Sequence, residues 1–474
     1  CRQISRRLSQ AAQQLTHAFF VAPRFFTQAW SLFLLINIMK PIQVGLLGIG
    51  TVGGGVFNVL DRNQEEITRR AGRGIKIHTV ADLDTKRAEE LVKGRAKVVG
   101  DAKQVVNDPE IDVVVELIGG YGIAKELVLA AINNGKHVVT ANKALLAVHG
   151  NEIFAAAQAK GVTVNFEAAV AGGIPIIKAL REGLTANRIE WIAGIINGTT
   201  NFILSEMRDK GLDFDVVLKE AQRLGYAEAD PTFDIEGVDA AHKATIMSAI
   251  AFGIPMQFDK AHVEGITKLS AIDIKYAEQL GYRIKLLGIT KKTKDGIELR
   301  VHPTLIPTKR LIANVEGAMN AVQVMGDAVG TTLYYGKGAG AEPTASAVIA
   351  DLVDVARLQT ADPEHRVPHL AFQPGSMVNT TIMPMGEITT SYYLRLRVAD
   401  VTGVLADITR ILADNSISID AMLQREAGDG ENQTDLIMLT HETKEKNILA
   451  AIAKVEALKT VEGSVTKIRL ENLS

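Results

Sequence analysis

The residues best suited to chemistry lie close together, in the segment EADPTFDIEGVDAAHK that runs from Glu228 to Lys243. Asp239 and Lys243 are four residues apart, so on a helix they share one face. Together with Glu228 and Asp234, they place several carboxylates around a single ammonium group. Such a group can seat the ammonium of an amino acid and leave the lysine as a proton donor. The alternative is an ordinary ion pair on a surface helix.

Two predicted helices and a loop would hold these side chains. The apolar spacing between Phe214 and Leu224 is that of a helix, and Gly225 is typical of the residue that ends one. Residues 226–237 are then predicted to form a loop, and a second helix begins near Val238. The loop carries most of the carboxylates, and the second helix carries the lysine.

A glycine-rich turn indicates a nucleotide site. The motif G-x-G-x-x-G directly follows the predicted strand Ile42–Leu47 and precedes an apolar helix, which is the order that a dinucleotide-binding turn requires. The first glycine makes the tight turn, and the second lets the backbone approach a pyrophosphate at the helix N-terminus. The predicted cofactor-binding residues of the motif are Gly48, Gly50, Thr51, Val52 and Gly53.

The end of the second predicted strand, Lys76–Val80, bears on the choice of cofactor. Ala81 cannot pair with a phosphate, whereas Asp82 can bond the 2′-hydroxyl of an NAD ribose. Lys86 or Arg87 could still serve the 2′-phosphate of NADP. We therefore expect NAD, with use of both NAD and NADP as the alternative.

The first part of the chain alternates strands and helices, which predicts a parallel, doubly wound, Rossmann-like sheet. Further strands are expected at Asp112–Leu117 and His137–Thr140. Lys143 follows the second of these, so it would reach the cleft beyond the strand ends, where such sheets bind their ligands. Otherwise it is a solvated lysine at the end of a strand.

The chain as a whole is predicted to be α/β, with three domains. The dinucleotide-binding domain spans residues 39–165 and is completed by a helix near 345–360. Residues 166–344 are predicted to form an α+β substrate and dimerisation domain with a mixed sheet. Residues 366–391, with scattered prolines and little periodicity, are a predicted linker. Residues 392–470 follow the order βαββαβ, the ferredoxin-like arrangement.

Composition is that of a globular protein. The chain has 474 residues, of which 47 % are apolar and 22 % charged, enough for about three domains. A net charge of −2 implies no nucleic-acid partner. The only cysteine is Cys1, so the body has no disulfide, zinc–thiolate site or cysteine nucleophile, which suits the cytoplasm.

Residues 1–38 differ from the rest, with four arginines, no acidic residue and the run SLFLLINI before Met39. We favour a non-native, translated upstream extension with Met39 as the true start. The alternatives are an Arg-rich transit peptide and a membrane anchor. The apolar run Trp30–Ile38 is far shorter than the ~20 residues that a membrane span needs. No other segment approaches that length, so no membrane helix is predicted.

The segment from Ala221 to Lys243 matches the pattern A-x3-G-Y-A-x2-D-P-x2-D-I-x-G-x-D-x3-K. On this signature the chain resembles the homoserine dehydrogenases, of the bacterial monofunctional type with a C-terminal ACT domain, from about Lys40 to its end. The resemblance implies NAD(P)-dependent interconversion of L-aspartate 4-semialdehyde and L-homoserine, in threonine, methionine and isoleucine biosynthesis. The alternatives are a dehydrogenase of another amino acid and a non-catalytic sensor, which would need no proton donor.

The resemblance also implies roles for individual residues. Lys243 would protonate the aldehyde oxygen as hydride arrives, and Gly340 of the sequence GKGAG would contact the cofactor. Many members of the family carry an arginine just after the second strand, where this chain has Ala81. The implied substrate-binding residues are Glu228, Asp234, Asp239, Gly198 and Lys143, the last at the nicotinamide side. Backbone carbonyls of Glu167, Val170, Gly172 and Ile174 would hold a structural, sodium-like cation.

The turn DVTGVL, Asp400–Leu405, resembles the D-x-P-G-V-L turn of ACT regulatory domains, with Thr402 in place of the proline. Feedback inhibition by L-threonine is therefore implied. Free N–H groups at the helix after Gly403 suit the carboxylate of an amino acid, and Asp420 or Asn415 would meet its amino group. Such modules pair across subunits, so a homodimer or homotetramer is expected. The alternative is an inert oligomerisation module.

Overall fold

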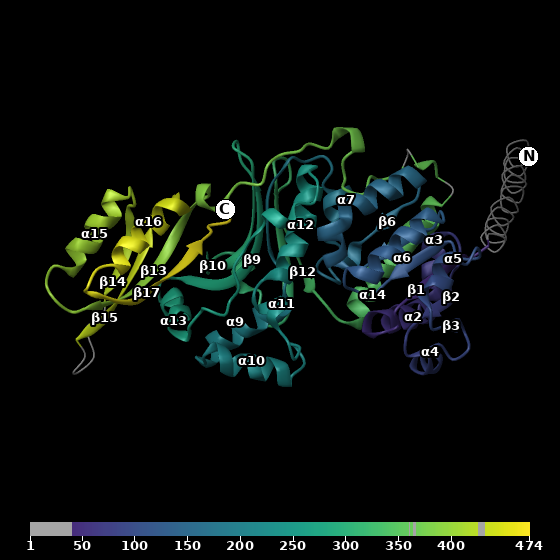
Figure 1. Ribbon diagram of the computed structural model, residues 1–474, viewed down its shortest axis with the longest axis horizontal. Coiled ribbons are helices and arrows are strands. Elements are labelled where there is room, and N and C mark those ends of the chain that lie inside the picture. Colours follow the sequence, from purple (N-terminus) through teal and green to yellow (C-terminus); the bar gives the residue numbers. More distant parts are fainter. Residues whose placement is uncertain (1–39, 360, 364–365, 425–431) are drawn as a thin grey trace, which may run out of the picture.

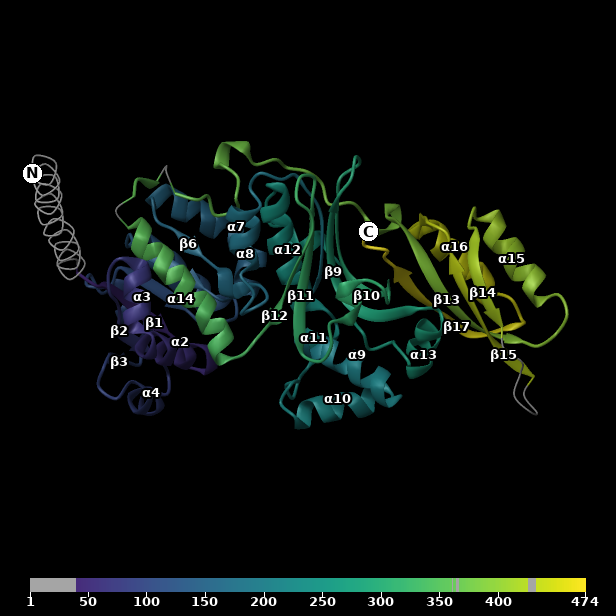
Figure 2. The same cartoon turned by 180° about the vertical axis from the view of Figure 1, so that it is seen from behind.

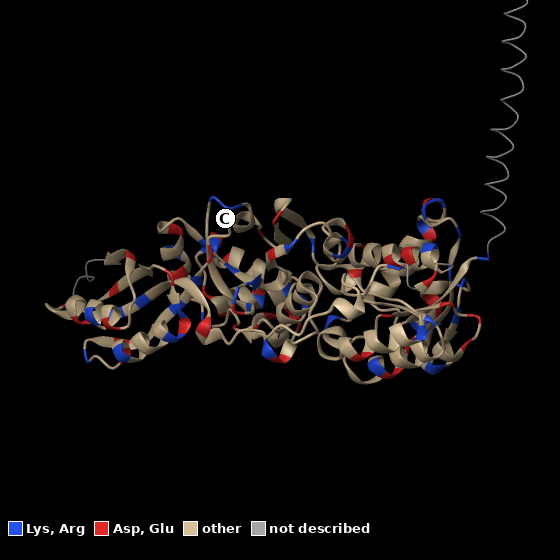
Figure 3. Ribbon diagram, turned by 90° about the horizontal axis from the view of Figure 1, so that it is seen from above, with Lys and Arg blue, Asp and Glu red and all other residues tan. Residues whose placement is uncertain are grey.

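The computed structural model describes residues 40–359, 361–363, 366–424 and 432–474, so the predicted extension of residues 1–38 lies outside it. The described residues form three parts in a row along the long axis of the molecule (Figure 1). The view from behind shows the same order (Figure 2). Basic and acidic residues are interspersed over all three parts (Figure 3). The α/β class and the three kinds of sheet are as predicted.

The first part contains a six-stranded sheet in the order β3-β2-β1-β4-β5-β6. All its neighbouring strands are parallel, and β1 and β4 adjoin at the centre, where the strand order reverses. Ligands of such sheets bind at this point, beyond the carboxyl ends of the strands. The strands are β1 Ile42–Leu47, β2 Ile75–Ala81, β3 Lys97–Val99, β4 Val113–Glu116, β5 His137–Thr140 and β6 Val164–Asn165.

Helices cover both faces of this sheet, and one of them comes from far along the chain. Helix α14 packs against α2 (Figures 1 and 2). A Cβ at Gly55 would lie 2.5 Å from the Ala341 carbonyl oxygen, so only glycine lets the two helices approach so closely. The helices of this part are α2 Thr51–Arg62, α3 Gln64–Ala71, α4 Thr85–Val92, α5 Ala102–Asn107, α6 Gly122–Asn133, α7 Lys143–Lys160 and α14 Ala341–Leu358.

The middle part is built on five antiparallel strands in the order β12-β11-β7-β9-β10, and the short β8 pairs with β10 in parallel. The sheet is therefore mixed, as predicted. The strands are β7 Ile189–Ile195, β8 His262–Val263, β9 Tyr282–Lys292, β10 Ile297–Pro307, β11 Met319–Gly326 and β12 Gly330–Lys337.

Helix α12 crosses one face of the middle sheet, where it contacts β7, β9 and β10. The predicted loop of residues 226–237 is not wholly irregular, because it contains the short helix α11. The four residues of α11 are followed at once by the turn into α12, so the acidic segment is compact. The helices are α8 Ile176–Lys178, α9 Gly198–Lys210, α10 Phe214–Arg223, α11 Thr232–Ile235, α12 Val238–Phe252 and α13 Ala271–Gln279.

The last part has the predicted βαββαβ order. Its strands lie in the order β17-β13-β15-β14, with an apolar core between the sheet and its two helices. Strand β13 begins at Thr389, three residues before the predicted start at Tyr392. The elements are β13 Thr389–Ala399, α15 Val404–Asp414, β14 Ile419–Gln424, β15 Gln433–Thr440, the short β16 Thr443–Lys444, α16 Glu445–Glu456 and β17 Val461–Leu470.

The sheets of the middle and last parts are continuous. Strand β17 pairs in parallel with β10, where Arg469 lies beside Thr304 and Leu470 beside Leu305. One sheet of eleven strands therefore runs through both parts. Tyr393 is fully buried and belongs to the same apolar core as the middle part. The last part is thus fused to the middle one through shared strands and a shared core.

Within the described residues, the helices are all too short or too polar to cross a bilayer.

Candidate active site

The acidic segment and its lysine form a buried ion pair. Helix α12 begins after Gly237, whose φ of +82° lets the chain turn into the helix. Lys243 Nζ lies 2.7 Å from Asp239 Oδ2 and donates a second bond, also 2.7 Å, to the carbonyl oxygen of Ile196. Lys243 is 9 % exposed and Asp239 is 4 % exposed, so the alternative of a surface ion pair is wrong.

A second lysine reaches the same carboxylate from the first part of the molecule. Lys143 is the first residue of α7, directly after β5, and its Nζ lies 3.2 Å from Asp239 Oδ1. Each oxygen of Asp239 therefore faces a different ammonium group. The site lies between the two domains, where a cofactor held by one could meet a substrate held by the other.

Asn197 ties the second carboxylate into this cluster. Its side-chain amide donates to Asp234 Oδ1 at 2.7 Å and to Asp239 Oδ2 at 2.9 Å. Thr199 donates to the other oxygen of Asp234 at 3.2 Å. Sequence reasoning singled out only Gly198 of this run and missed Asn197 and Thr199. The available signal was a polar NGTTN run at the junction of a strand and a helix.

The position of α9 explains why these groups converge. Asn197 caps α9 by accepting a bond from the Thr200 N–H at 2.8 Å. Gly198 is the first residue of that helix, so its N–H has no partner within the helix. A Cβ there would lie 2.8 Å from the Ala318 carbonyl oxygen, which favours glycine.

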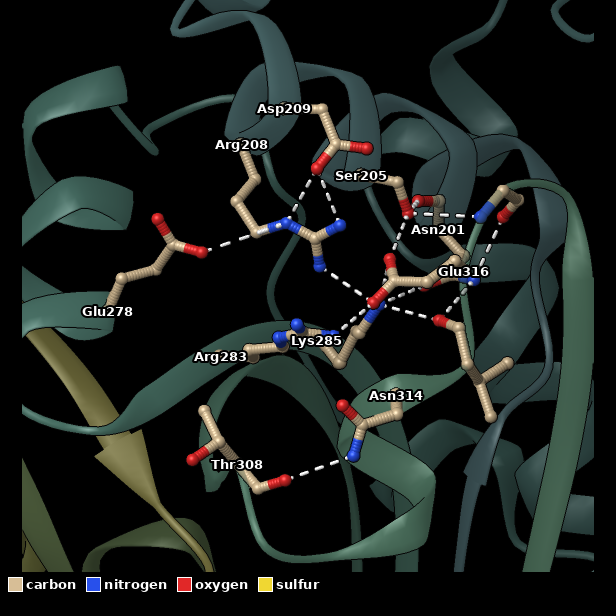
Figure 4. A network of polar contacts seen from close by, with 12 residues as sticks. Asn201, Ser205, Arg208, Asp209, Glu278, Arg283, Lys285, Thr308, Asn314 and Glu316 are labelled. Atoms are coloured by element: carbon tan, nitrogen blue, oxygen red, sulfur yellow. Dashed lines mark hydrogen bonds and ion pairs between the residues drawn. The ribbon is translucent and has the colours of Figure 1, made fainter.

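One turn later, a polar network anchors α9 (Figure 4). The Asn201 amide donates to the carbonyls of Val315, Gly317 and Met319. Lys285 donates to Val315 O at 2.6 Å and to Asn201 Oδ1 at 3.1 Å. Burial lowers the pKa of Lys285 to about 8, against the opposing charge of Glu316. This network holds the helix whose N-terminus faces the site.

Burial and charge set the protonation states of the cluster. Burial lowers the pKa of Lys243, and the Asp239 carboxylate opposes this shift. Burial alone would raise the pKa of Asp239, but the charges of Lys243 and Lys143 outweigh it and hold that pKa below its usual range. Burial and the nearby Asp239 charge raise the pKa of Asp234. The result is a fixed carboxylate beside a lysine that releases its proton more readily than usual.

Glu228 stands apart from this buried cluster. It lies exposed on the segment between α10 and α11, and its backbone carbonyl accepts a bond from Gln222. The structure therefore brings together Lys243, Asp239, Asp234 and Lys143, with Gly198 beside them, but leaves Glu228 at the surface.

The glycine turn has the geometry that a pyrophosphate requires. Gly48 has a φ of +88°, which favours glycine. A Cβ at Gly53 would lie 2.1 Å from the Gly48 carbonyl oxygen, so the helix can approach the strand only with glycine there. A Cβ at Gly50 would meet nothing within 4 Å, so this edge is open. Thr51 and Val52 begin α2, and their N–H groups face the open edge of the turn.

Asp82 has a use that its sequence position did not reveal. Its Oδ2 accepts a bond from the Ile49 N–H at 2.8 Å, and its Oδ1 accepts one from the Asp84 N–H at 3.0 Å. The carboxylate thus braces the glycine turn from the second strand. Each oxygen keeps a further lone pair, so the predicted bond to a ribose hydroxyl stays possible.

The segment that ends at Gly340 lies in backbone contact with the predicted cation turn. Gly340 precedes α14 with a φ of +122°. Just before it, the Lys337 carbonyl accepts a bond from the Gly173 N–H at 3.0 Å. A Cβ at Gly172 would lie 2.4 Å from the Gly338 carbonyl oxygen. The two glycine-rich segments therefore support one another through backbone contact.

The predicted cation turn would offer backbone carbonyl oxygens. Each oxygen of the Glu167 carboxylate accepts one backbone bond, from the Ile177 and Lys178 N–H groups at 2.9 and 2.8 Å. Ala171, between Val170 and Gly172, has a φ of +55°, a strained conformation for alanine. Carbonyl oxygens of such a turn, with that of Ile174, suit a hard monovalent cation. Over the described part of the chain, His, Cys, Asp and Glu form no group of three or more placed to hold a metal.

Comparison with known families identifies three stretches. Residues 48–167 match the NAD-binding domain of homoserine dehydrogenase, residues 175–353 match the homoserine dehydrogenase family itself, and residues 392–460 match the ACT domain. The first match lies in the first part, the second covers the middle part and most of α14, and the third lies in the last part and ends just before β17.

Similar proteins cover almost the whole chain. The homoserine dehydrogenase of Pseudomonas aeruginosa is 62 % identical over 437 residues, which are 92 % of this chain and all of the relative. A crystal structure of a homoserine dehydrogenase from Thiobacillus denitrificans is 71 % identical, with a TM-score of 0.88, and the match covers 92 % of this chain and 99 % of that one. A hyperthermophilic archaeal homoserine dehydrogenase in complex with NADPH is 26 % identical, with a TM-score of 0.58, over 68 % of this chain and 99 % of that one.

Proposed function

The chain belongs to the homoserine dehydrogenase family and is an oxidoreductase with an NAD-binding and an ACT domain; from this premise we propose how its residues work. The reaction is the interconversion of L-homoserine and L-aspartate 4-semialdehyde. The observation that carries the proposal is the buried cluster in which Asp239 joins Lys243 and Lys143. The bound nicotinamide cofactor supplies or accepts the hydride.

Lys243 is the proton donor and acceptor. Two of its three N–H bonds go to Asp239 and to the Ile196 carbonyl, which leaves one for the substrate oxygen. When an aldehyde is reduced, negative charge builds on its oxygen, and a positioned ammonium stabilises that charge and then neutralises it. In the oxidation of homoserine, neutral Lys243 accepts the proton of the hydroxyl group. Burial lowers its pKa, so it gives up a proton more readily than an exposed lysine.

The carboxylates seat the ammonium group of the substrate. Asp234 keeps lone pairs beyond its bonds to Asn197 and Thr199, and Asp239 holds both lysines in place. The N–H of Gly198 offers a backbone contact to the substrate. Lys143 stands on the nicotinamide side, and exposed Glu228 would reach the substrate from the rim of the cleft.

The cofactor is NAD(P), and we expect a preference for NAD. Ala81 offers nothing to a 2′-phosphate, and the negative charge of Asp82 at the end of β2 disfavours one. Lys86 and Arg87, in the first turn of α4, leave use of both cofactors open. The backbone carbonyls of Glu167, Val170, Gly172 and Ile174 would hold a sodium-like cation with a structural role, since such a set suits a hard monovalent cation but forms no open catalytic site.

Regulation by L-threonine fits the C-terminal part. Gly403, with a φ of +95°, precedes α15, whose first N–H groups and positive dipole end suit a carboxylate. The Asn415 amide is engaged with the Ile411 carbonyl and with Lys454, which leaves Asp420 as the candidate for the ligand amino group. We propose that the enzyme acts in threonine, methionine and isoleucine biosynthesis, in the cytoplasm, as a homodimer or homotetramer.

A substrate assay tests the reaction. The full chain is incubated with NAD or NADP and L-homoserine, and the absorbance of the reduced cofactor is followed. Parallel reactions contain other amino acids of similar size with a side-chain hydroxyl or none. Reduction with homoserine alone is expected. Faster reduction with another amino acid would support the alternative dehydrogenase instead.

A further inference from the structure

One buried arginine links the C-terminal part to the middle part. Arg469, near the end of β17, is 1 % exposed. Its guanidinium donates to both oxygens of Glu445, the first residue of α16, at 2.9 and 2.6 Å. It also donates to both oxygens of Glu264, at 2.8 Å each. Glu264 follows β8 in the middle part, so a single planar group joins two domains through two bidentate pairs.

The segment after Glu264 rests directly on the acidic segment of the active site. The Ile266 N–H donates to the Ile235 carbonyl at 2.8 Å, and Thr267 donates to the Glu236 carboxylate at 3.1 Å. A Cβ at Gly265 would lie 2.3 Å from the Ile235 carbonyl oxygen, so the two segments touch without a gap.

The contacted residues lie between the two carboxylates of the site. Ile235 follows Asp234 directly, and Glu236 precedes the turn that begins α12 with Asp239. A shift of residues 264–267 would therefore move both proposed ammonium seats together.

We propose that Glu264 is a positioning residue for substrate binding, through which Arg469 lets the C-terminal domain set the place of Asp234 and Asp239. This inference rests on the proposed function, in which those two carboxylates seat the substrate ammonium.

The charges around Arg469 stabilise its ion pairs with Glu264 and Glu445. Burial opposes ionisation of Glu264, but hydrogen bonds from Arg469 and His262 outweigh it and lower the pKa of that carboxyl. Lys467 forms an ion pair with Glu445, so two cations face two carboxylates. The removal of one partner leaves a buried charge without its counterpart, which destabilises the junction.

Glu264→Gln and Glu445→Gln form a matched pair for the test. Each replaces one carboxylate partner of Arg469 with an amide of the same shape. Only Glu264 belongs to the segment that contacts Ile235 and Glu236. Glu264→Gln should raise the KM for homoserine by about fivefold or more, a usual size for coupling between sites. The KM for the cofactor should stay within about twofold of the wild type. Glu445→Gln should lower the Tm while the KM for homoserine remains near that of the wild type.

Gly265→Ala supplies a second route that does not touch Arg469. Its new methyl group would press on the Ile235 carbonyl, so the KM for homoserine should again rise with little change in the KM for the cofactor. This variant carries the test if Glu264→Gln fails to fold.

The outcomes separate the two claims. If the wild type oxidises homoserine but both Glu264→Gln and Gly265→Ala keep its KM, the positioning role is overturned. An equal rise of that KM in Glu264→Gln and Glu445→Gln would also overturn it, because the arginine would then only stabilise the junction. If the wild type itself does not oxidise homoserine, the proposed function fails, and the inference with it.

Discussion

Lys143 Nζ lies 3.2 Å from Asp239 Oδ1, and this contact joins the nucleotide-binding part of the molecule to the substrate part. Asp239 binds Lys243 through its other oxygen. The carboxylate therefore keeps two ammonium groups apart and oriented at the cleft between the domains. Both lysines depend on one carboxylate. A substitution at any of the three residues should therefore lower turnover more than it weakens cofactor affinity.

Lys243→Ala should lower turnover by roughly 100-fold or more, which is the usual contribution of a positioned general acid. Cofactor affinity, measured by the fluorescence of bound NADH or NADPH, should be retained because the glycine turn lies in the other domain. Lys268→Ala, at an exposed lysine, is the control and should behave as the wild type. Turnover close to normal in Lys243→Ala would exclude Lys243 as the proton donor.

The two directions of the reaction should depend on pH in opposite ways. Burial lowers the pKa of Lys243 from its ordinary value of 10.5. Homoserine oxidation needs the neutral amine, so its initial rate should rise with pH through this pKa, and aldehyde reduction needs the ammonium, so its rate should fall. Asp239→Asn should move the midpoint lower, because the carboxylate raises this pKa. Identical profiles in both directions would contradict the assignment.

Asp82 can be tested for its two uses separately. Asp82→Asn keeps an acceptor for the Ile49 N–H but removes the negative charge, so the ratio of kcat/KM for NADP to that for NAD should rise. Asp82→Ala should change the ratio in the same direction and also weaken both cofactors, since the glycine turn loses its brace. Steady-state kinetics with each cofactor measures this. If the ratio does not move in either variant, Asp82 does not select the cofactor.

Acid should destabilise the fold through its buried histidines. Burial lowers the pKa of His137, His242 and His369 to about 4, and lowers that of His302 well below the ordinary 6.5. The folded pKa values are depressed, so this stability is fully present above pH 6.5 and is lost as pH falls toward 4, because the unfolded chain then binds more protons. The Tm should fall as the pH is lowered from 6.5 to 4.5, and the buried carboxyls of Glu167 and Asp351, whose pKa values burial raises to about 7 and about 8, should offset part of this loss.

The matched variant for this effect is His369→Gln, which removes one buried imidazole. The slope of unfolding free energy against pH should become shallower by about one proton. A Tm that does not change over this range would show that the histidines take up protons without unfolding.

L-threonine should inhibit the full chain at millimolar concentration. Gly403→Val should weaken inhibition and leave turnover intact, because a β-branched residue is strained at a φ of +95° and distorts the start of α15. Gly72→Val, at a φ of +80° in the first part, imposes the same kind of strain far from this module and should remain inhibited. An enzyme that ignores threonine, or a Gly403 variant that is still fully inhibited, would disprove this regulatory role.

Removal of the C-terminal part would be a poor test of regulation. A chain that ends near Met385 would lose β17, which pairs with β10, and would expose that strand as a new edge. It would also leave buried Asp273 without the bonds from Tyr393 and Arg395. Loss of activity in such a chain would therefore report on folding as much as on control.

The sequence by itself determined the local parts of this protein. The glycine turn could be predicted because Gly48 and Gly53 meet backbone constraints that lie within one strand, turn and helix. The pairing of Asp239 with Lys243 follows from helix geometry alone, since residues four apart share a face. The βαββαβ order of the C-terminal part follows in the same way from the periodicity of its apolar residues.

Only the tertiary structure decided which residues of different units contact one another. Asn197 bridges Asp234 and Asp239, Asp82 braces the turn at Ile49, and Lys143 reaches a carboxylate 96 positions later in the chain. None of these contacts has a spacing that a sequence pattern records, because each depends on how whole sheets and helices are placed. The continuation of β10 into β17 is of the same kind. It joins the sheet of the expected separate module to that of the middle part, because an open strand edge pairs with whichever strand the fold brings beside it.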